Sequence, residues 1–119
     1  MSNYFLVFLG GGLGSICRYG IAHFMFAYKL DYPWATFLAN VLACFVLGAM
    51  VGLSMKDRLG GAMALLIMSG FCGGFSTFST FTNETFQLMM NGEWWKAGAN
   101  VVMSLVVCLV SLYIGMKAV

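Results

Sequence analysis

The stretch GFCGGFSTFSTF, residues 70–81, lies inside a long apolar run of the chain. It nevertheless contains the adjacent glycines Gly73 and Gly74, four hydroxyl side chains and four phenylalanines. This mixture is typical neither of a lipid-facing helix nor of a soluble core. The stretch therefore raises the question of what chemistry needs hydroxyl groups and phenyl rings side by side where water is excluded.

The composition of the whole chain indicates a membrane protein. Of its 119 residues, 61% are apolar and only 8% are charged, which lies outside the range of soluble globular domains. A hydrocarbon core about 30 Å thick requires roughly 20 apolar residues per helical span. The charged residues divide the chain into four such segments, and we expect spans at about 4–28, 32–54, 62–86 and 95–116. The sequence thus predicts one all-α domain, residues 1–119, with four transmembrane helices.

Short connectors join the expected spans, around Asp31, around Arg58 and across residues 91–96. Connectors of this length force neighbouring helices to run antiparallel and leave no room for a soluble domain. With an even number of spans, the N-terminus and C-terminus lie on the same side of the membrane.

The basic residues give almost no bias to the orientation of the chain. Lys56, Arg58 and Lys117 lie on one side of the membrane, and Lys29 and Lys96 lie on the other. Membrane proteins are normally oriented by a clear excess of Lys and Arg on the cytoplasmic side. With three basic residues against two, the chain can insert in both directions, and two oppositely inserted copies can pair about a twofold axis in the membrane plane. A single, weakly determined orientation is the alternative.

The paired glycines stand near the centre of the expected third span, where such a twofold axis passes. Glycines cost helix propensity and allow close backbone approach, so they are compatible with a helix break near the centre of this span. A break at Gly73 and Gly74 would aim carbonyl oxygens at those of a second copy, and such a cluster favours a cation. The competing interpretation is close packing of helices by small residues.

A stripe of phenyl rings follows the glycines. Phe75, Phe78 and Phe81 recur every three residues and share one helical face. Hydroxyl groups lie beside them, on Ser76, Ser79, Thr80 and Thr82. Ring edges carry partial positive charge and hydroxyls donate hydrogen bonds, so the stripe suits a small anion that must enter and leave without meeting a fixed cation. Ordinary packing of the rings is the alternative.

Two further polar residues fall within expected spans. Asn40 lies about 10 Å deep in the second span, and its amide offers two donors. Helix association through an amide is the alternative role for it. Arg18 lies late in the first span, where a functional role or capping of carbonyls on a neighbouring helix is possible, and we favour the structural role.

Four segments, one from each span, resemble the CrcB/Fluc family of fluoride channels. They are FLGGGLGSICRYG (8–20), FLANVLACFVLG (37–48), GFCGGFSTFSTFTNE (70–84) and ANVVMS (99–104). The resemblance implies a passive, fluoride-selective ion channel of a bacterial inner membrane, not an enzyme. It further implies an antiparallel, dual-topology homodimer in membrane lipid, with two fluoride pores, a central sodium ion and no nucleic-acid partner.

The resemblance also implies roles for individual residues. Phe78 and Phe81 would be the rings of the fluoride pore, Ser79 and Thr80 its hydroxyls, Asn40 its amide donor, and Gly73 and Ser76 the carbonyl ligands of sodium. Many relatives have threonine in place of Ser76, a change to which a carbonyl ligand is insensitive. Relatives also place a tyrosine in the fourth-span polar track, and Tyr113 lies too near the span end for that role.

Two alternatives belong to other functional classes. A small multidrug-type transporter also uses four spans and dual topology, but it requires a carboxylate inside the membrane to exchange protons for a cationic substrate. We expect the four acidic residues, Asp31, Asp57, Glu84 and Glu93, to lie at span ends or in connectors. A purely structural membrane subunit would leave the stripe of hydroxyls and rings without a purpose.

Overall fold

The computed structural model describes residues 2–28 and 32–119, which are almost entirely helical. The elements are α1 (Asn3–Phe26), α2 (Trp34–Met55), α3 (Gly61–Ala64), η1 (Leu65–Cys72), α4 (Gly73–Phe75), α5 (Phe78–Met90) and α6 (Trp94–Lys117). Four helical segments in these ranges are long and apolar enough to cross a membrane, at 3–26, 34–55, 61–90 and 94–117. The all-α architecture with four spans is therefore confirmed. The expected connector at Asp31 lies outside the described residues.

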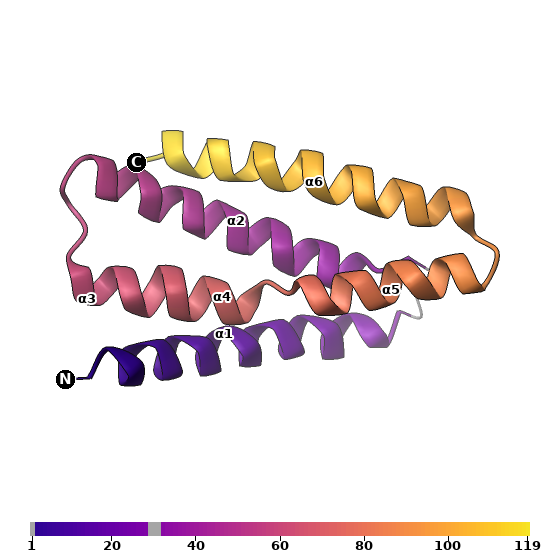
Figure 1. Ribbon diagram of the computed structural model, residues 1–119, viewed down its shortest axis with the longest axis horizontal. Coiled ribbons are helices and arrows are strands. Elements are labelled where there is room, and N and C mark those ends of the chain that lie inside the picture. The colour runs from indigo at the N-terminus through magenta and orange to yellow at the C-terminus, as the bar shows by residue number, and fades with distance from the viewer. Residues whose placement is uncertain (1, 29–31) are drawn as a thin grey trace.

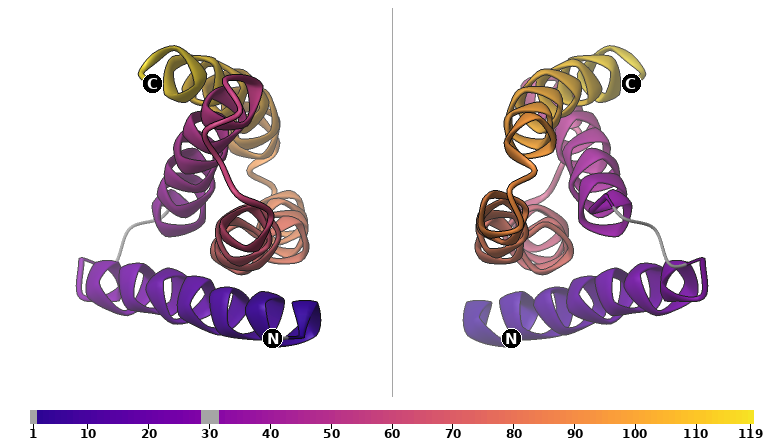
Figure 2. Two further views of the ribbon diagram at one scale, coloured as in Figure 1. Left: turned by 90° about the vertical axis from the view of Figure 1, so that its left-hand side faces the viewer. Right: turned by 90° about the vertical axis from the view of Figure 1, so that its right-hand side faces the viewer.

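The four spans run side by side in alternating directions. Both termini and the connection between α2 and α3 lie at one end of the molecule, and the turn between α5 and α6 lies at the other (Figure 1). Viewed along its length, the bundle places α1 on one outer side and α6 on the opposite side, with α2 and the third span between them (Figure 2). The antiparallel order of neighbours follows from the short connectors.

Glycines let α1 approach the third span closely. A Cβ atom at Gly10 would overlap the Leu66 carbonyl oxygen, and one at Gly74 would overlap the Gly11 carbonyl oxygen. Gly14 meets the backbone of Phe71 in the same way. Gly10 and Gly14 are buried in this contact, which has the small-residue spacing common at helix interfaces in membranes. Of the two central glycines, Gly74 therefore serves helix packing.

A second glycine contact joins α2 to α6. A Cβ atom at Gly48 would overlap the Leu112 carbonyl oxygen, and one at Gly115 would overlap the Phe45 carbonyl oxygen. The Ser111 hydroxyl also donates to the Val41 carbonyl oxygen at 2.8 Å. These contacts hold the two helices at a backbone separation that larger residues would not permit.

The third span is broken near its centre, but not at the paired glycines. Gly73 and Gly74 are helical within α4, and the chain becomes extended at Ser76 (ψ 158°) and Thr77 (φ −153°). The break that was expected at Gly73 and Gly74 was wrong in position. The chain leaves the helix at Ser76, and Thr77 is the N-cap of the next helix, α5, which begins at Phe78. The Thr77 hydroxyl accepts a hydrogen bond from the Thr80 amide at 3.2 Å, as an N-cap residue does.

The first half of the span contains a second irregularity, which the sequence pattern did not predict. Residues Leu65–Cys72 form a π-helical segment, η1. It lies against the glycine face of α1, where Gly10 and Gly14 contact the backbone at Leu66 and Phe71. Such a segment is uncommon, because π-helix occurs mostly as single-turn bulges within α-helices, frequently at functional sites.

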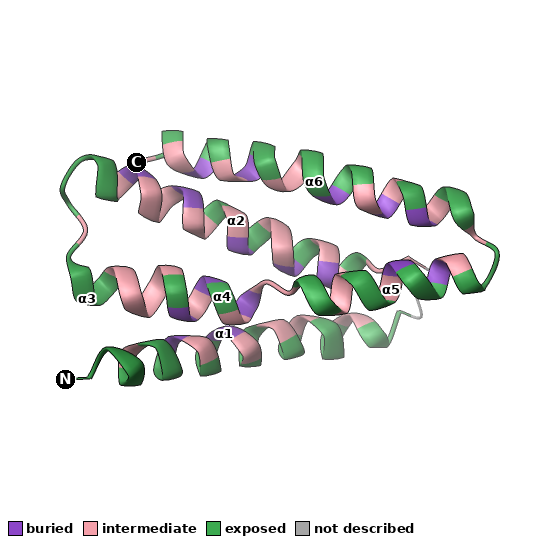
Figure 3. Cartoon of the chain, in the orientation of Figure 1, coloured by how far each residue is buried: buried purple, intermediate pink, exposed green. Residues whose placement is uncertain are grey.

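Little of a single copy is buried. A cluster of Ala39, Ala43 and Phe75 forms the centre of a small buried core. Exposed residues cover most of the outer helix faces (Figure 3). Many of the exposed side chains are large and apolar, among them Phe8, Phe78 and Leu109. Such surfaces suit contact with lipid or with a second protein chain.

Candidate functional site

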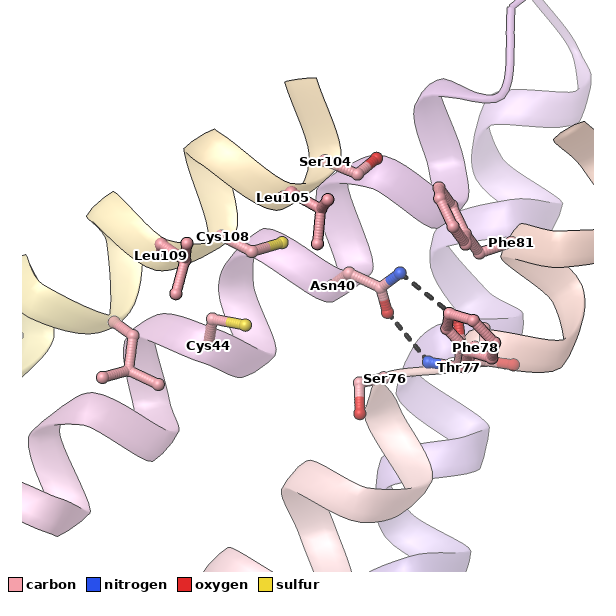
Figure 4. Close-up of a pocket in the computed structure, with 11 residues that line it drawn as sticks. Asn40, Cys44, Ser76, Thr77, Phe78, Phe81, Ser104, Leu105, Cys108 and Leu109 are labelled. Carbon is pink, nitrogen blue, oxygen red and sulfur yellow. Dashed lines mark hydrogen bonds between the residues drawn. The ribbon is translucent and has the colours of Figure 1, made fainter. Parts of the chain in front are cut away.

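A pocket of about 320 Å³ opens beside the break in the third span. Its wall comes from α2, from α6, from the segment that joins α4 to α5 and from the first turn of α5 (Figure 4). The lining residues are Asn40, Cys44, Ser76, Thr77, Phe78, Phe81, Ser104, Leu105, Cys108, Leu109 and Leu112. None of these lining residues carries a formal charge. The pocket therefore offers polar donors and ring edges in apolar surroundings.

Asn40 joins α2 to the break. Its Nδ2 donates to the Thr77 carbonyl oxygen at 3.3 Å, and its Oδ1 accepts from the Thr77 amide at 2.8 Å (Figure 4). Thr77 is the extended N-cap of α5, so its amide has no partner within a helix and needs one from elsewhere. Asn40 supplies that partner and also donates to the Thr77 carbonyl oxygen. One N–H of its amide is thereby used, and the amide has a second N–H.

Phe78 and Phe81 lie on the first turn of α5 and both line the pocket. Their ring centroids are 5.8 Å apart, and the ring planes are inclined by 41°. In this arrangement ring edges rather than faces can turn toward a bound anion. Phe78 is 78% exposed in a single copy, so its ring forms an open side of the pocket.

The predicted hydroxyl residues divide into two groups. Ser79 and Thr80 are not among the residues that line this pocket. The Thr80 hydroxyl accepts a hydrogen bond from Thr77 Oγ1 at 3.2 Å, and the Ser79 hydroxyl lies 3.3 Å from the same atom. Ser76 lines the pocket, although its hydroxyl donates to the Cys72 carbonyl oxygen at 2.7 Å.

Several lining residues were missed by the sequence reasoning. Thr77 holds the break, and the preference of threonine for helix N-caps was the available signal. Cys44 lies four positions after Asn40, and Cys108 lies four positions after Ser104. Each cysteine therefore shares a helix face with a polar residue of the pocket wall. This spacing could have identified them once the pocket faces of α2 and α6 were known.

Arg18 lies on α1 and reaches the end of α4. Its Nε donates to the Gly74 carbonyl oxygen at 3.1 Å, and the Ser15 hydroxyl donates to the same oxygen at 3.5 Å. In a continuous helix the Phe78 amide would donate to this carbonyl, and the break removes that donor. A guanidinium group at this position satisfies the carbonyl and places a positive charge at the C-terminal end of α4, near the pocket.

Gly73 and Ser76 offer main-chain carbonyl oxygens, which are suitable ligands for a sodium ion. In a continuous helix the Thr77 amide would donate to the Gly73 carbonyl, but here it donates to Asn40 Oδ1. The Gly73 carbonyl is thus released from its usual helical bond. Gly73 is exposed, and a Cβ atom there would meet nothing within 4 Å in its own chain. Main-chain oxygens of this kind are ligands for hard cations, so the residues present fit the ion.

A polar network lies farther along α5 and α6. Asn100 Nδ2 donates to Thr85 Oγ1 at 2.9 Å, and Ser104 Oγ lies 3.4 Å from Asn100 Oδ1, to which it donates. Asn100 is only 2% exposed. Since Ser104 also lines the pocket, the network connects the pocket wall to the interior of the helix pair.

Glu84 lies within α5, six residues before the third span ends at Met90. The Thr36 side chain on α2 lies near its carboxyl group. Its buried Oε1 has no hydrogen-bond partner among the described residues. The third span therefore carries a carboxyl group toward the end of α5.

Comparisons of the sequence with family models and with known proteins point to the same family. The family model "CrcB-like protein, Camphor Resistance (CrcB)" matches residues 5–116. A relative from Shewanella sp. (strain ANA-3), named fluoride-specific ion channel FluC, is 41% identical over 120 residues, which cover 100% of this chain and 97% of the relative. The relative of the same name from Shewanella oneidensis (strain MR-1) has the same identity and coverage. That from Shewanella baltica (strain OS185) is 40% identical with equal coverage.

Proposed function

The chain belongs to the CrcB-like protein family, and from this membership we propose that it is a fluoride-selective channel through which fluoride leaves the cytoplasm passively. The observation that carries the proposal is the pocket at the helix break. It combines a phenylalanine pair with the Asn40 amide, and its lining residues carry no charge.

The chemistry of the pocket suits a small, strongly hydrated anion. Asn40 can donate its second N–H, while the edges of Phe78 and Phe81 provide partial positive charge. A lysine in the wall would hold an anion too tightly for rapid passage, because conduction needs affinity that permits both entry and exit. The uncharged wall therefore favours conduction over storage. A channel of this kind carries out no covalent chemistry and is not an enzyme.

A second copy of the chain would complete the site. Phe78 is 78% exposed beside the pocket, and Gly73 has open space around it. Both residues lie near the middle of the third span, Gly61–Met90, where an axis in the membrane plane would pass. The nearly equal basic charge on the two sides favours insertion in both directions. We therefore propose an antiparallel, dual-topology homodimer in the inner membrane of a bacterium.

A sodium ion is proposed at the centre of this dimer. Each copy would contribute the main-chain oxygens of Gly73 and Ser76, so that two copies would provide four oxygens. When bound, the ion would supply a fixed positive charge that offsets repulsion between anions in neighbouring pores. This chain's part is to present the carbonyls, and it does so by ending α4 and by engaging the Thr77 amide with Asn40.

Flux from proteoliposomes tests the proposed function. We expect purified protein to release fluoride rapidly and to exclude chloride, because closely spaced donors that replace the water around fluoride should fit a larger anion poorly. Electrodes for the two anions would measure both rates in the same vesicle preparation. Comparable efflux of chloride and fluoride would overturn the proposal.

One observation supports a second candidate, a small multidrug-type transporter. Glu84 provides a carboxyl group on the third span with an unpartnered oxygen among the described residues, and proton exchange for a cationic drug needs a carboxyl group inside the membrane. Ethidium uptake driven by a pH gradient in the same vesicles distinguishes the two candidates. We expect no ethidium movement, and proton-coupled ethidium transport without fluoride flux would favour the transporter.

A further inference from the structure

Two thiols face the pocket from neighbouring helices. Cys44 on α2 and Cys108 on α6 both line it, and their side chains lie near enough to interact with each other (Figure 4). Both residues are partly exposed. Cys44 lies one helical turn from Asn40, so the thiols are adjacent to the group proposed to meet fluoride.

The distance between the two thiols is set by the packing of their helices. Gly48, one turn beyond Cys44, meets the backbone of Leu112, one turn beyond Cys108. On the same pair of helices, Ser111 is hydrogen-bonded to the Val41 carbonyl at 2.8 Å. The helix backbones therefore hold the pair together, and a ligand that needs both sulfurs finds them preorganised.

We propose that Cys44 and Cys108 form a binding site for one soft, monovalent d¹⁰ cation of the Ag⁺ or Cu⁺ class. Thiolate sulfur is the ligand that such cations select over oxygen donors. Binding would displace one thiol proton, so that one thiolate, one thiol and the cation form a complex with no net charge. No electron is transferred, and no oxidant is required. A neutral complex suits this apolar pocket, because a buried net charge is costly.

The other two cysteines lack this arrangement. Cys17 is exposed on α1 and lines a different, apolar hollow together with Phe24 and Leu38. Cys72 is buried and lies near enough to Cys44 to interact with it electrostatically, but it does not line the pocket. In a metal-binding experiment, Cys17 is therefore replaced because it is an independent, exposed thiol. Cys72 serves as the matched control, because it is a thiol close to Cys44 that does not line the pocket.

A bound cation would also affect transport, a consequence that rests on the proposed channel function. The pocket has a volume of only about 320 Å³, and the thiols share it with Asn40 and Phe81. A metal ion held between the sulfurs would occupy space beside the fluoride donors and draw the two side chains into one fixed position. Fluoride flux would then fall.

Silver binding to the purified full-length protein tests the site directly. Protein with Cys17→Ser, which lacks the exposed thiol, would be titrated with silver nitrate in chloride-free buffer, and retained silver would be measured by mass spectrometry. We expect one silver ion per chain. Adding Cys44→Ser or Cys108→Ser should weaken binding by at least about tenfold, whereas adding Cys72→Ser should leave it unchanged. Silver retention that is insensitive to both pocket substitutions, or that is lost with Cys72→Ser, would overturn the proposal.

Measurements of fluoride flux distinguish the proposed metal site from the proposed channel function, on which the predicted effect on transport rests. Silver should lower the fluoride efflux of the Cys17→Ser protein by at least about tenfold, and Cys44→Ser and Cys108→Ser should each restore efflux. Protein that binds silver at the pair but never conducts fluoride would contradict the channel function while leaving the metal site intact. Silver that binds the pair without changing an existing fluoride flux would refute the placement of the thiols beside the fluoride path.

Discussion

At the scale of single residues, Asn40 shows how one amide can hold backbone and still face a pocket. It pairs with both backbone groups of Thr77, of which the amide is left without a helical partner by the break. An unsatisfied backbone group in a membrane costs several kcal/mol, on the order of the desolvation penalty for an amide. The side chain therefore stabilises the break and leaves one N–H for an anion.

The two pocket rings can be tested by a change that keeps their apolar bulk. Phe78→Ile or Phe81→Ile should lower fluoride flux by at least about tenfold, because isoleucine has no positively polarised ring edge. Phe78 is mostly exposed in one copy, so its replacement should change the fold of the chain little. Proteoliposome efflux and gel filtration in detergent would measure the two effects.

Phe86→Ile is the matched control for the ring substitutions. Phe86 also lies on α5 and is 53% exposed, but it does not line the pocket. We expect it to leave fluoride flux unchanged. Equal flux in the Phe78→Ile protein and the unmodified protein would mean that this ring only packs.

At the scale of elements, the break in the third span results from local hydroxyl chemistry and from partners on two other helices. Thr77 caps α5, and hydroxyl side chains of this type compete with the helical hydrogen-bond pattern. Arg18 from α1 satisfies the Gly74 carbonyl, and Asn40 from α2 satisfies Thr77. The break is thus held from both sides, which explains how extended backbone is tolerated at the middle of a membrane span.

Asn40→Asp tests this account of the break. The substitution removes the donor to the Thr77 carbonyl and sets a carboxylate against that oxygen, and it also places negative charge beside the anion path. We expect fluoride flux to be abolished and unfolding in detergent to be easier by about 1–3 kcal/mol. Thermal unfolding followed by circular dichroism, together with efflux, would measure both effects. Unchanged thermal stability would show that the amide is not needed to hold the break.

At the scale of the whole molecule, a single copy leaves much of its central surface without contacts in its own chain. Its buried core is small, its pocket is open at Phe78, and Gly73 meets nothing of its own chain. By contrast, Gly74 is packed against Gly11. One of the adjacent central glycines therefore serves the fold of the chain, and the other has space for a partner.

Gly73→Val should disrupt the dimer and its sodium site, because added methyl groups would crowd the approach of a second backbone. Gly98→Val is the control, since Gly98 is also exposed, helical and without neighbours within 4 Å in its own chain. Light scattering in detergent should find monomer for Gly73→Val and dimer for Gly98→Val. In the unmodified protein, replacing sodium with N-methylglucamine should lower fluoride flux as well. A dimeric, sodium-dependent Gly73→Val protein would contradict this assignment.

The balance of basic residues predicts that both orientations coexist in one membrane. Reporter fusions after Val119 should detect the C-terminus on both sides, because Lys and Arg differ by only one residue between the two faces. Adding lysines at the C-terminus should shift the population toward one orientation. A C-terminus found on one side alone in the unmodified protein would refute dual topology.

The sequence by itself determined the four membrane spans and their antiparallel order. Hydropathy is a local property, so segments of sufficient apolar length must become helices in a membrane whatever their neighbours are. Connector length then dictates direction. The family motifs could also be read from the sequence, because they are contiguous, and the family is confirmed by the match over residues 5–116.

Only the tertiary structure decided where the third span breaks and which side chains surround the break. Thr77 is joined to Asn40 across 37 positions, and the Gly74 carbonyl to Arg18 across 56. The tertiary structure likewise places Cys44 and Cys108 on the wall of one pocket. These contacts depend on how closely helices approach one another, which glycines at their crossing points permit, and local periodicity contains no information about that distance. The sequence could suggest a break at the glycines because glycine is a poor helix former, but the backbone broke where other helices supplied hydrogen-bond partners.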